Sequence, residues 1–133
     1  MTKTLCAALA ASVLALAGCG GGGDSSSSAP KLSAPQQAVK DTVLSWTFEG
    51  NCDAMTDKFL DDQAFFGDTR DERCAYLMKT FQKPRYSEDD LKFRSIKVTG
   101  TKATVVVGSD ISNVTSTYSL LQQGGKWRID AAS

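Results

Sequence analysis

The chain has 133 residues, and its 15 Lys and Arg balance its 15 Asp and Glu at a formal net charge of zero. Because no basic stripe is present to follow a phosphate backbone, we expect no nucleic-acid partner. The sequence contains no histidine, the commonest general base at neutral pH, and it shows no Gly-rich phosphate loop or nucleophile elbow. These features predict a protein that is not an enzyme and that needs no cofactor.

The chain begins with an apolar segment. Residues 5–17 are almost entirely Leu, Ala and Val, and as a helix they would extend about 20 Å, too short for a hydrocarbon core of ~30 Å. This favours a removable signal over a membrane span. The segment ends in Leu-Ala-Gly-Cys at residues 16–19, which resembles the bacterial lipobox. The resemblance implies cleavage after residue 18 and lipidation of Cys19; the alternative is an ordinary secretory signal in which Cys19 is incidental.

Residues 20–34 are rich in Gly and Ser, a composition typical of a flexible tether. We therefore divide the chain into a signal peptide at 1–18, a lipidated Cys19 with its tether at 19–34, and one folded domain at 35–133. On this interpretation the protein is exported and anchored to the cell membrane through lipid on Cys19. Its domain then faces the periplasm or the cell exterior.

The first helix is predicted over residues 34–49. Ser33 and Gln36 can form a capping box at its start, and Gly50 can adopt the left-handed conformation that ends many helices.

Two more helices are predicted behind it. One begins after the capping residue Asn51 and ends near residue 63, and the other spans 70–82 behind a capping box of Thr69 and Glu72. Their apolar positions recur at helical spacing and are expected to face inward. These positions are Cys52, Met55, Phe59, Leu60, Cys74, Leu77, Met78 and Phe81.

Cys52 and Cys74 are the two cysteines of the domain, and both lie on predicted inward faces. Exported proteins favour disulfides, so we expect one bridge between them. A redox role would need a closer pair, and a metal site would need more ligands. Closing a loop of roughly 23 residues is expected to contribute about 3 kcal/mol.

From residue 91 the apolar period changes from 3.6 to 2, which predicts strands. The phase slips near Arg94 and Ser95, as a β-bulge would cause. Residues 103–107 form a β-branched run, and 114–120 alternate again. With turns at Gly100-Thr101 and Gly124-Gly125 and a last strand at 126–130, the pattern predicts a four-stranded antiparallel meander.

Three helices followed by a bent antiparallel sheet define an α+β fold in which N-terminal helices pack on the sheet. With the closing Gly-Gly-Lys-Trp-Arg-Ile at residues 124–129, this order resembles the NTF2-like (cystatin-like cone) superfamily over about residues 35–133. More narrowly, the chain resembles small bacterial lipoproteins that carry such a domain. The resemblance implies a space between sheet and helices, which some members use for catalysis. No enzyme motif matches here, so we assign no catalytic residue.

Aromatic side chains could line a pocket in that space, or they could simply fill the core. The candidates are Trp46, Phe59, Tyr118 and Trp127. Phe65 and Phe66, in a short predicted loop, could likewise form an exposed contact patch or fold back onto the core.

Asp53, Asp57 and Asp61 recur at i, i+4 and i+8 of the predicted second helix. Such a set could hold a hard cation, but a solvated helix face with Asp53 near the N-terminus is the simpler interpretation. We therefore expect no metal site.

The leading hypothesis is a membrane-anchored envelope lipoprotein whose non-catalytic domain serves binding or assembly with an unknown protein or small molecule. The alternative is a small-molecule binding protein or enzyme that uses a pocket inside the NTF2-like cone.

Overall fold

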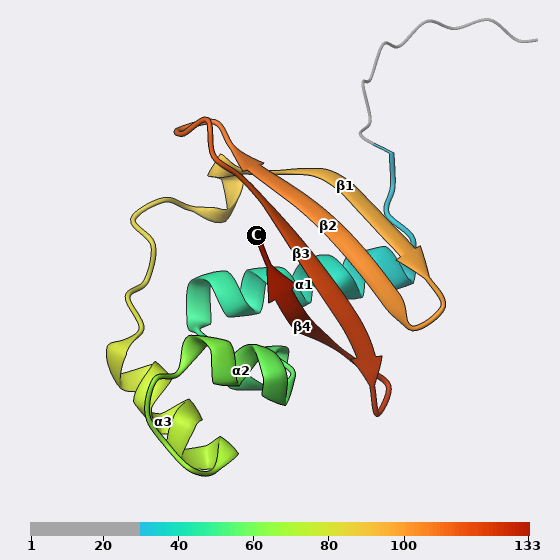
Figure 1. The fold of residues 1–133 in the computed structure, drawn as a ribbon. Helices are drawn as coiled ribbons and strands as arrows, with labels where there is room; N and C mark the ends of the chain where they lie inside the picture. Colours follow the sequence, from blue (N-terminus) through green and yellow to red (C-terminus); the bar gives the residue numbers. More distant parts are fainter. Residues whose placement is uncertain (1–29) are drawn as a thin grey trace, which may run out of the picture. The chain divides into compact units, whose positions relative to one another are not determined.

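The computed structural model describes residues 30–133 (Figure 1). The predicted signal peptide, Cys19 and the tether up to residue 29 lie outside the described residues. The elements follow in the order α1 (Ala34–Glu49), η1 (Cys52–Ala54), α2 (Asp57–Gln63), α3 (Arg70–Thr80), η2 (Glu88–Asp90), β1 (Leu91–Thr99), β2 (Lys102–Ser109), β3 (Thr115–Gln123) and β4 (Lys126–Ala132). This confirms the α+β class. Within residues 30–133, no helix combines the length and the apolar character that crossing a bilayer would require.

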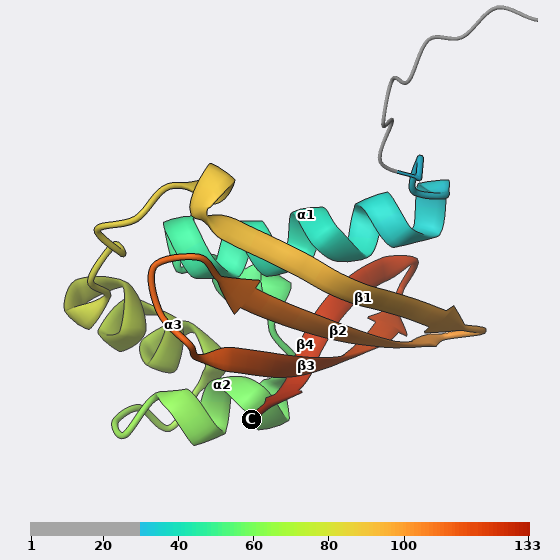
Figure 2. The same ribbon diagram turned by 90° about the horizontal axis from the view of Figure 1, so that it is seen from above.

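The four strands form one antiparallel sheet in the order β1-β2-β3-β4, so the predicted meander is confirmed. The register of β1 against β2 shifts between Phe93 and Ser95, at the predicted bulge. No sequence pattern predicts the second shift, between Ser119 and Leu120 opposite β4. Bulges bend strands and increase their twist, and Figure 2 shows the curved sheet that results. Val114, expected in the third strand, lies before β3 and is exposed.

Helix α1 lies against the sheet, where it contacts β1, β2 and β4. It begins at the predicted capping box of Ser33 and Gln36. The side-chain amide of Gln36 also donates a hydrogen bond to the carbonyl oxygen of Ile96 in β1, at 2.9 Å. Val39 and Val43 are fully buried between helix and sheet, so apolar burial fixes the helix over the strands.

Close packing fixes the end of α1. Gly50 has a φ of 64°, which only glycine adopts at no steric cost. A Cβ at this position would also lie 2.7 Å from Cγ of Phe81. The position therefore needs glycine for two reasons, and the predicted helix end is confirmed.

The prediction of one continuous second helix is wrong. The chain forms the short helix η1 and then breaks at Met55, which makes a parallel bridge with Ile129 of β4. The backbone N–H of Thr56 donates to the carbonyl oxygen of Ile129 at 2.9 Å, and the Thr56 hydroxyl accepts from the N–H of Phe59 to cap α2. Pairing with β4 therefore satisfies backbone groups that a continuous helix would have used internally.

Residues 51–80, from η1 to the end of α3, form a unit that we call the helical arm. Helix α2 contacts β4, whereas α3 packs mainly against α2. The expectation that all three helices pack on the sheet therefore needs correction for α3. Leu77 is the buried residue of α3, while Met78, predicted to face inward, is 48% exposed. The helix ends at Thr80 because Phe81 is extended.

The core lies between the sheet, α1 and α2. Trp127 and Ile129 of β4 are both buried in it. The fully buried side chains of largest volume come from α1, from the break before α2, from α2 itself and from the sheet. They are Val39, Val43, Met55, Leu60, Val105, Leu120 and Ile129.

Candidate functional site

Two of the four aromatic residues predicted for a pocket pack against each other. The rings of Trp46 and Phe59 meet edge to face with centroids 5.9 Å apart, and Trp46 also lies 6.1 Å from Phe81. Phe59 is buried in the apolar cluster, and Trp46 is half-buried against it. These two side chains therefore serve the core.

Tyr118 and Trp127 line different hollows. Trp127 lies at the wall of an open hollow of about 410 Å³, beside Asp41 and Asp53. Tyr118 lines a cavity of about 90 Å³ near Thr47. The structure thus separates the four aromatic candidates instead of gathering them around one ligand-sized space.

The cavity beside Tyr118 is small and lined with hydroxyl groups. The hydroxyl-bearing residues Thr47, Ser109, Ser116 and Tyr118 are among those that line it, and so is the apolar Val107. Burial raises the pKa of the Tyr118 phenol above its ordinary value of 10.0. The volume corresponds to about three water molecules in the liquid, whereas pockets for small-molecule ligands start near ~300 Å³.

The predicted acidic face is divided between two short helices. Asp53 belongs to η1, whereas Asp57 and Asp61 belong to α2 and form ion pairs with Arg70 and Arg73 of α3. The two carboxylates on α2 therefore join the two helices of the arm. Within the part of the chain that the structure describes, no three potential metal-ligating side chains cluster.

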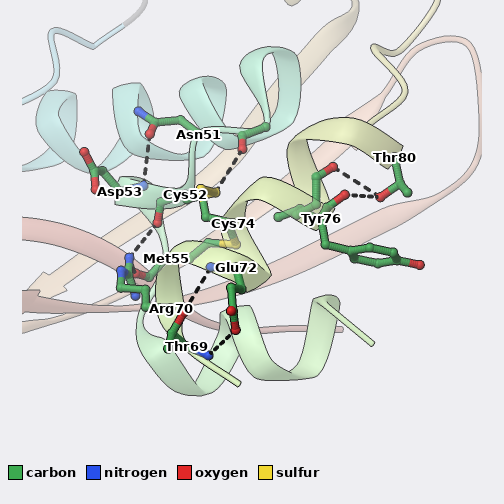
Figure 3. The surroundings of a disulfide bond; sticks show 12 residues. Asn51, Cys52, Asp53, Met55, Thr69, Arg70, Glu72, Cys74, Tyr76 and Thr80 are labelled. Carbon is green, nitrogen blue, oxygen red and sulfur yellow. Dashed lines mark hydrogen bonds between the residues drawn. A yellow bond between two sulfur atoms is a disulfide. The ribbon is translucent and has the colours of Figure 1, made fainter. Parts of the chain in front are cut away.

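The predicted disulfide between Cys52 and Cys74 is present (Figure 3). It joins η1 to α3, and the two Cα atoms lie 5.8 Å apart. Since α3 packs mainly on α2, this covalent link ties the outer helix to the segment that reaches the sheet.

Arg70 provides a second link at the same place, which the sequence analysis missed. Its guanidinium, which lies beside Cys52 and Met55 in Figure 3, donates to the carbonyl oxygens of these two residues at 2.8 and 3.1 Å. It also forms an ion pair with Asp57. A planar guanidinium can serve several acceptors at once. Arg70 thereby satisfies backbone groups at the break that separates η1 from α2.

The turn between α2 and α3 carries the largest exposed aromatic side chains. We call residues 64–69 the phenylalanine loop. Phe65 is 85% exposed and Phe66 is 66% exposed. Of the two predicted alternatives, the contact patch fits and folding back onto the core does not. The Phe66 ring packs edge to face with that of Tyr76 on α3, with centroids 5.2 Å apart.

Side chains of α3 hold this exposed loop in place by binding its backbone groups. The Arg73 guanidinium donates to the carbonyl oxygen of Gly67 at 2.9 Å. Gly67 has a φ of 119°, and a Cβ there would lie 2.7 Å from the backbone nitrogen of Arg73. The loop conformation therefore depends on glycine at this position.

The capping box of α3 adds two more bonds. The Glu72 carboxylate accepts from the backbone N–H groups of Asp68 and Thr69, at 2.9 and 3.1 Å. These donors lower the pKa of Glu72 below 4.5, so the carboxylate is ionised at neutral pH. The predicted box of Thr69 and Glu72 is confirmed, and it fixes the phenylalanine loop as well as the helix.

Comparison with known proteins adds little to this description. No family model matches the chain, and no curated protein matches it. A solved NTF2-like protein of unknown function from Silicibacter pomeroyi is similar at 19% identity and a TM-score of 0.40, over 74% of this chain and 89% of that one. The class that the structure itself defines is an α+β domain with a four-stranded antiparallel meander. A likeness of this size assigns neither a family nor a function to it.

Proposed function

We propose that the chain is a lipid-anchored envelope protein whose NTF2-like domain binds a partner without catalysis. The sequence supports the anchor, since the lipobox-like residues 16–19 stand between an apolar segment and a Gly/Ser-rich tether. The order of helices before a curved meander supports the NTF2-like assignment. Two acyl chains on Cys19 would suffice for stable attachment to a bilayer.

The observation that carries binding at the surface is the contrast between a filled interior and an exposed apolar loop. Met55, Leu120 and Ile129 are fully or almost fully buried between sheet and helices, and the cavity beside Tyr118 measures about 90 Å³. Large apolar side chains instead reach solvent in the phenylalanine loop. An exposed aromatic pair on a braced loop is typical of a protein contact site.

Metabolic labelling with a radioactive fatty acid tests the anchor. Cys19→Ser should remove the label and move the protein from the membrane fraction to the soluble fraction. Cys6→Ser, which changes a cysteine inside the predicted signal peptide, is the matched control and should leave both unchanged. A Cys19→Ser protein that keeps its label and stays with the membrane would contradict the anchor.

A second candidate function is small-molecule binding in the cavity beside Tyr118. The specific observation in its favour is a set of hydroxyl groups around a partly enclosed space. Native mass spectrometry of protein purified from its own cells should then show a bound small molecule that Val107→Phe, which fills the cavity, displaces. Protein of unmodified mass in both samples would rule against this candidate.

A further inference from the structure

We infer that the phenylalanine loop is the contact site for a protein partner whose surface is apolar at its centre and rimmed by Lys or Arg. The inference rests on the proposed binding function and names the surface and the kind of partner. Aromatic side chains at a protein interface act as anchors that enter pockets on the partner. Phe65 and Phe66 are adjacent in the chain, and their exposed fractions of 85% and 66% leave both rings accessible to a partner.

The loop is arranged for binding before a partner arrives. Arg73 holds the carbonyl oxygen of Gly67, and the Glu72 carboxylate holds the backbone N–H groups of Asp68 and Thr69. The arm behind the loop is closed by a disulfide. Because these contacts already fix the backbone, a partner would lose little affinity to ordering the loop.

The charges around the loop select the partner. Residues 57–73 contain six acidic and three basic side chains. Among the described residues, all three basic ones pair with acids of α2, namely Asp57, Asp61 and Asp62. Asp68, Asp71 and Glu72 beside the two phenylalanines form no ion pair within that same part of the chain. Opposite charge steers association, so a basic rim on the partner fits this surface.

The same charges disfavour two other occupants. An anionic bilayer surface attracts basic segments and would repel these three carboxylates. A second copy of the chain, joined symmetrically through the same patch, would bring like charges together. A basic protein surface is the remaining occupant of matching chemistry.

The phenylalanine loop lies at one end of the domain. Figures 1 and 2 show the turn between α2 and α3 at the end of the domain opposite to the start of α1. The chain enters the fold at that start, beside Lys31. The phenylalanine loop therefore lies away from the first residues of the domain (Figures 1 and 2).

Photocrosslinking in living cells tests the inference. The full-length protein carries p-benzoylphenylalanine in place of Phe66, which keeps an aromatic group at the contact. We expect a discrete protein adduct. Its yield should fall about tenfold in the Asp68→Lys/Asp71→Lys background and by less in Asp68→Asn/Asp71→Asn. The matched control, Glu88→Lys/Asp89→Lys, makes the same charge change on exposed residues of η2 and should leave the yield unchanged.

Three results would overturn the inference. The first is an adduct between two copies of the chain. The second is an adduct yield that does not change with the charge at residues 68 and 71. The third is the absence of any adduct from correctly anchored protein. A vesicle experiment covers the bilayer: purified domain that binds vesicles of phosphatidylethanolamine and phosphatidylglycerol through Phe65 and Phe66 would also overturn it.

A second crosslinker position separates this inference from the proposed function. Ile111 lies on the loop between β2 and β3 and is 68% exposed. Adducts from position 111 but none from position 66 would leave the binding function standing and refute the site. Fatty-acid labelling of the same cells reports on the anchor independently of either adduct.

Discussion

The body of the domain and the outer helix α3 are stabilised in different ways. The sheet and α1 enclose fully buried aliphatic side chains, such as Val43, Val105 and Ile129. Helix α3 buries Leu77 alone and depends on the disulfide and on arginine contacts with α2 and η1. Burial of apolar surface stabilises the body and α2, whereas cross-links stabilise α3.

This difference explains why two phenylalanine side chains can remain exposed in the loop before α3. A core-facing position would draw Phe65 and Phe66 inward, because burial of a phenylalanine side chain contributes about 1.5–3 kcal/mol. Helix α3, which follows the loop, has Leu77 as its one buried residue and so offers them little apolar surface. The cross-links hold α3 in place without using those two side chains.

The largest effect is expected from a truncation in the body. Leu120 on β3 is 1% exposed, so Leu120→Ala should lower the free energy of unfolding by about 4 kcal/mol, through lost burial and the cavity left behind. Urea denaturation measures this. Leu121→Ala, at the next position of the same strand and only partly buried, is the control and should cost less than half as much. Equal losses would contradict the assignment of the inner face.

Removal of the disulfide should come next. Cys52→Ala/Cys74→Ala is expected to lower the free energy of unfolding by about 3 kcal/mol, because the unfolded chain regains the freedom of the closed loop. Guanidinium denaturation with and without reductant checks it. Reductant should destabilise the native protein to a similar extent and leave the double variant unchanged. A reductant effect on the double variant would show that another group is responsible.

Loss of the Arg70 side chain should lower the free energy of unfolding by less than loss of the disulfide does, but by more than loss of an exposed arginine does. Arg70→Ala removes the hydrogen bonds from Arg70 to the carbonyl oxygens of Cys52 and Met55, and within residues 30–133 only the Cys52 oxygen keeps a second donor, the backbone N–H of Met55. We therefore expect a loss of about 2 kcal/mol in unfolding free energy. Arg85→Ala, at an exposed position, is the control and should change stability by less than ~0.5 kcal/mol. Thermal denaturation compares the two. Indistinguishable midpoints would refute the role given to Arg70.

The smallest expected effect is a loss of stability at acidic pH through protonation of Glu72. The pKa of Glu72 is lowered by the backbone N–H donors of Asp68 and Thr69. The unfolded carboxyl therefore binds its proton more readily, so its contribution to stability is present above pH 4.5 and is lost as the pH falls through the lowered value. NMR titration should show the amide signals of Asp68 and Thr69 moving together below pH 4.5. In Glu72→Gln this movement should disappear; its persistence would point to another carboxyl.

Local sequence signals predicted where several helices and turns begin or end. The capping boxes at Ser33 and Thr69, the end of α1 at Gly50 and the turn at Gly124-Gly125 depend on residues a few positions apart. Their chemistry can be recognised within one turn of chain. The bulge beside Phe93 was visible for the same reason, as a slip in the apolar period.

The arm was harder to predict because its structure depends on contacts between residues distant in sequence. Nothing near Met55 indicates that it pairs with Ile129. Two signals could still have helped. Thr56 is a good capping residue in front of Asp57, and the acids at 57 and 61, like the arginines at 70 and 73, are about one helical turn apart. The aromatic pocket was not predictable either way, since Trp46 and Tyr118 fit a core as well as a cavity.

Hydrogen–deuterium exchange of the oxidised and the reduced protein tests the central claim most directly, namely that cross-links hold α3 while burial holds the body and α2. Reduction of the Cys52–Cys74 bond should raise the exchange rate of the α3 amides and of the phenylalanine loop. The amides of β2 and β3 should remain protected as before. Equal acceleration in α3 and in the sheet, or none in α3, would contradict the claim.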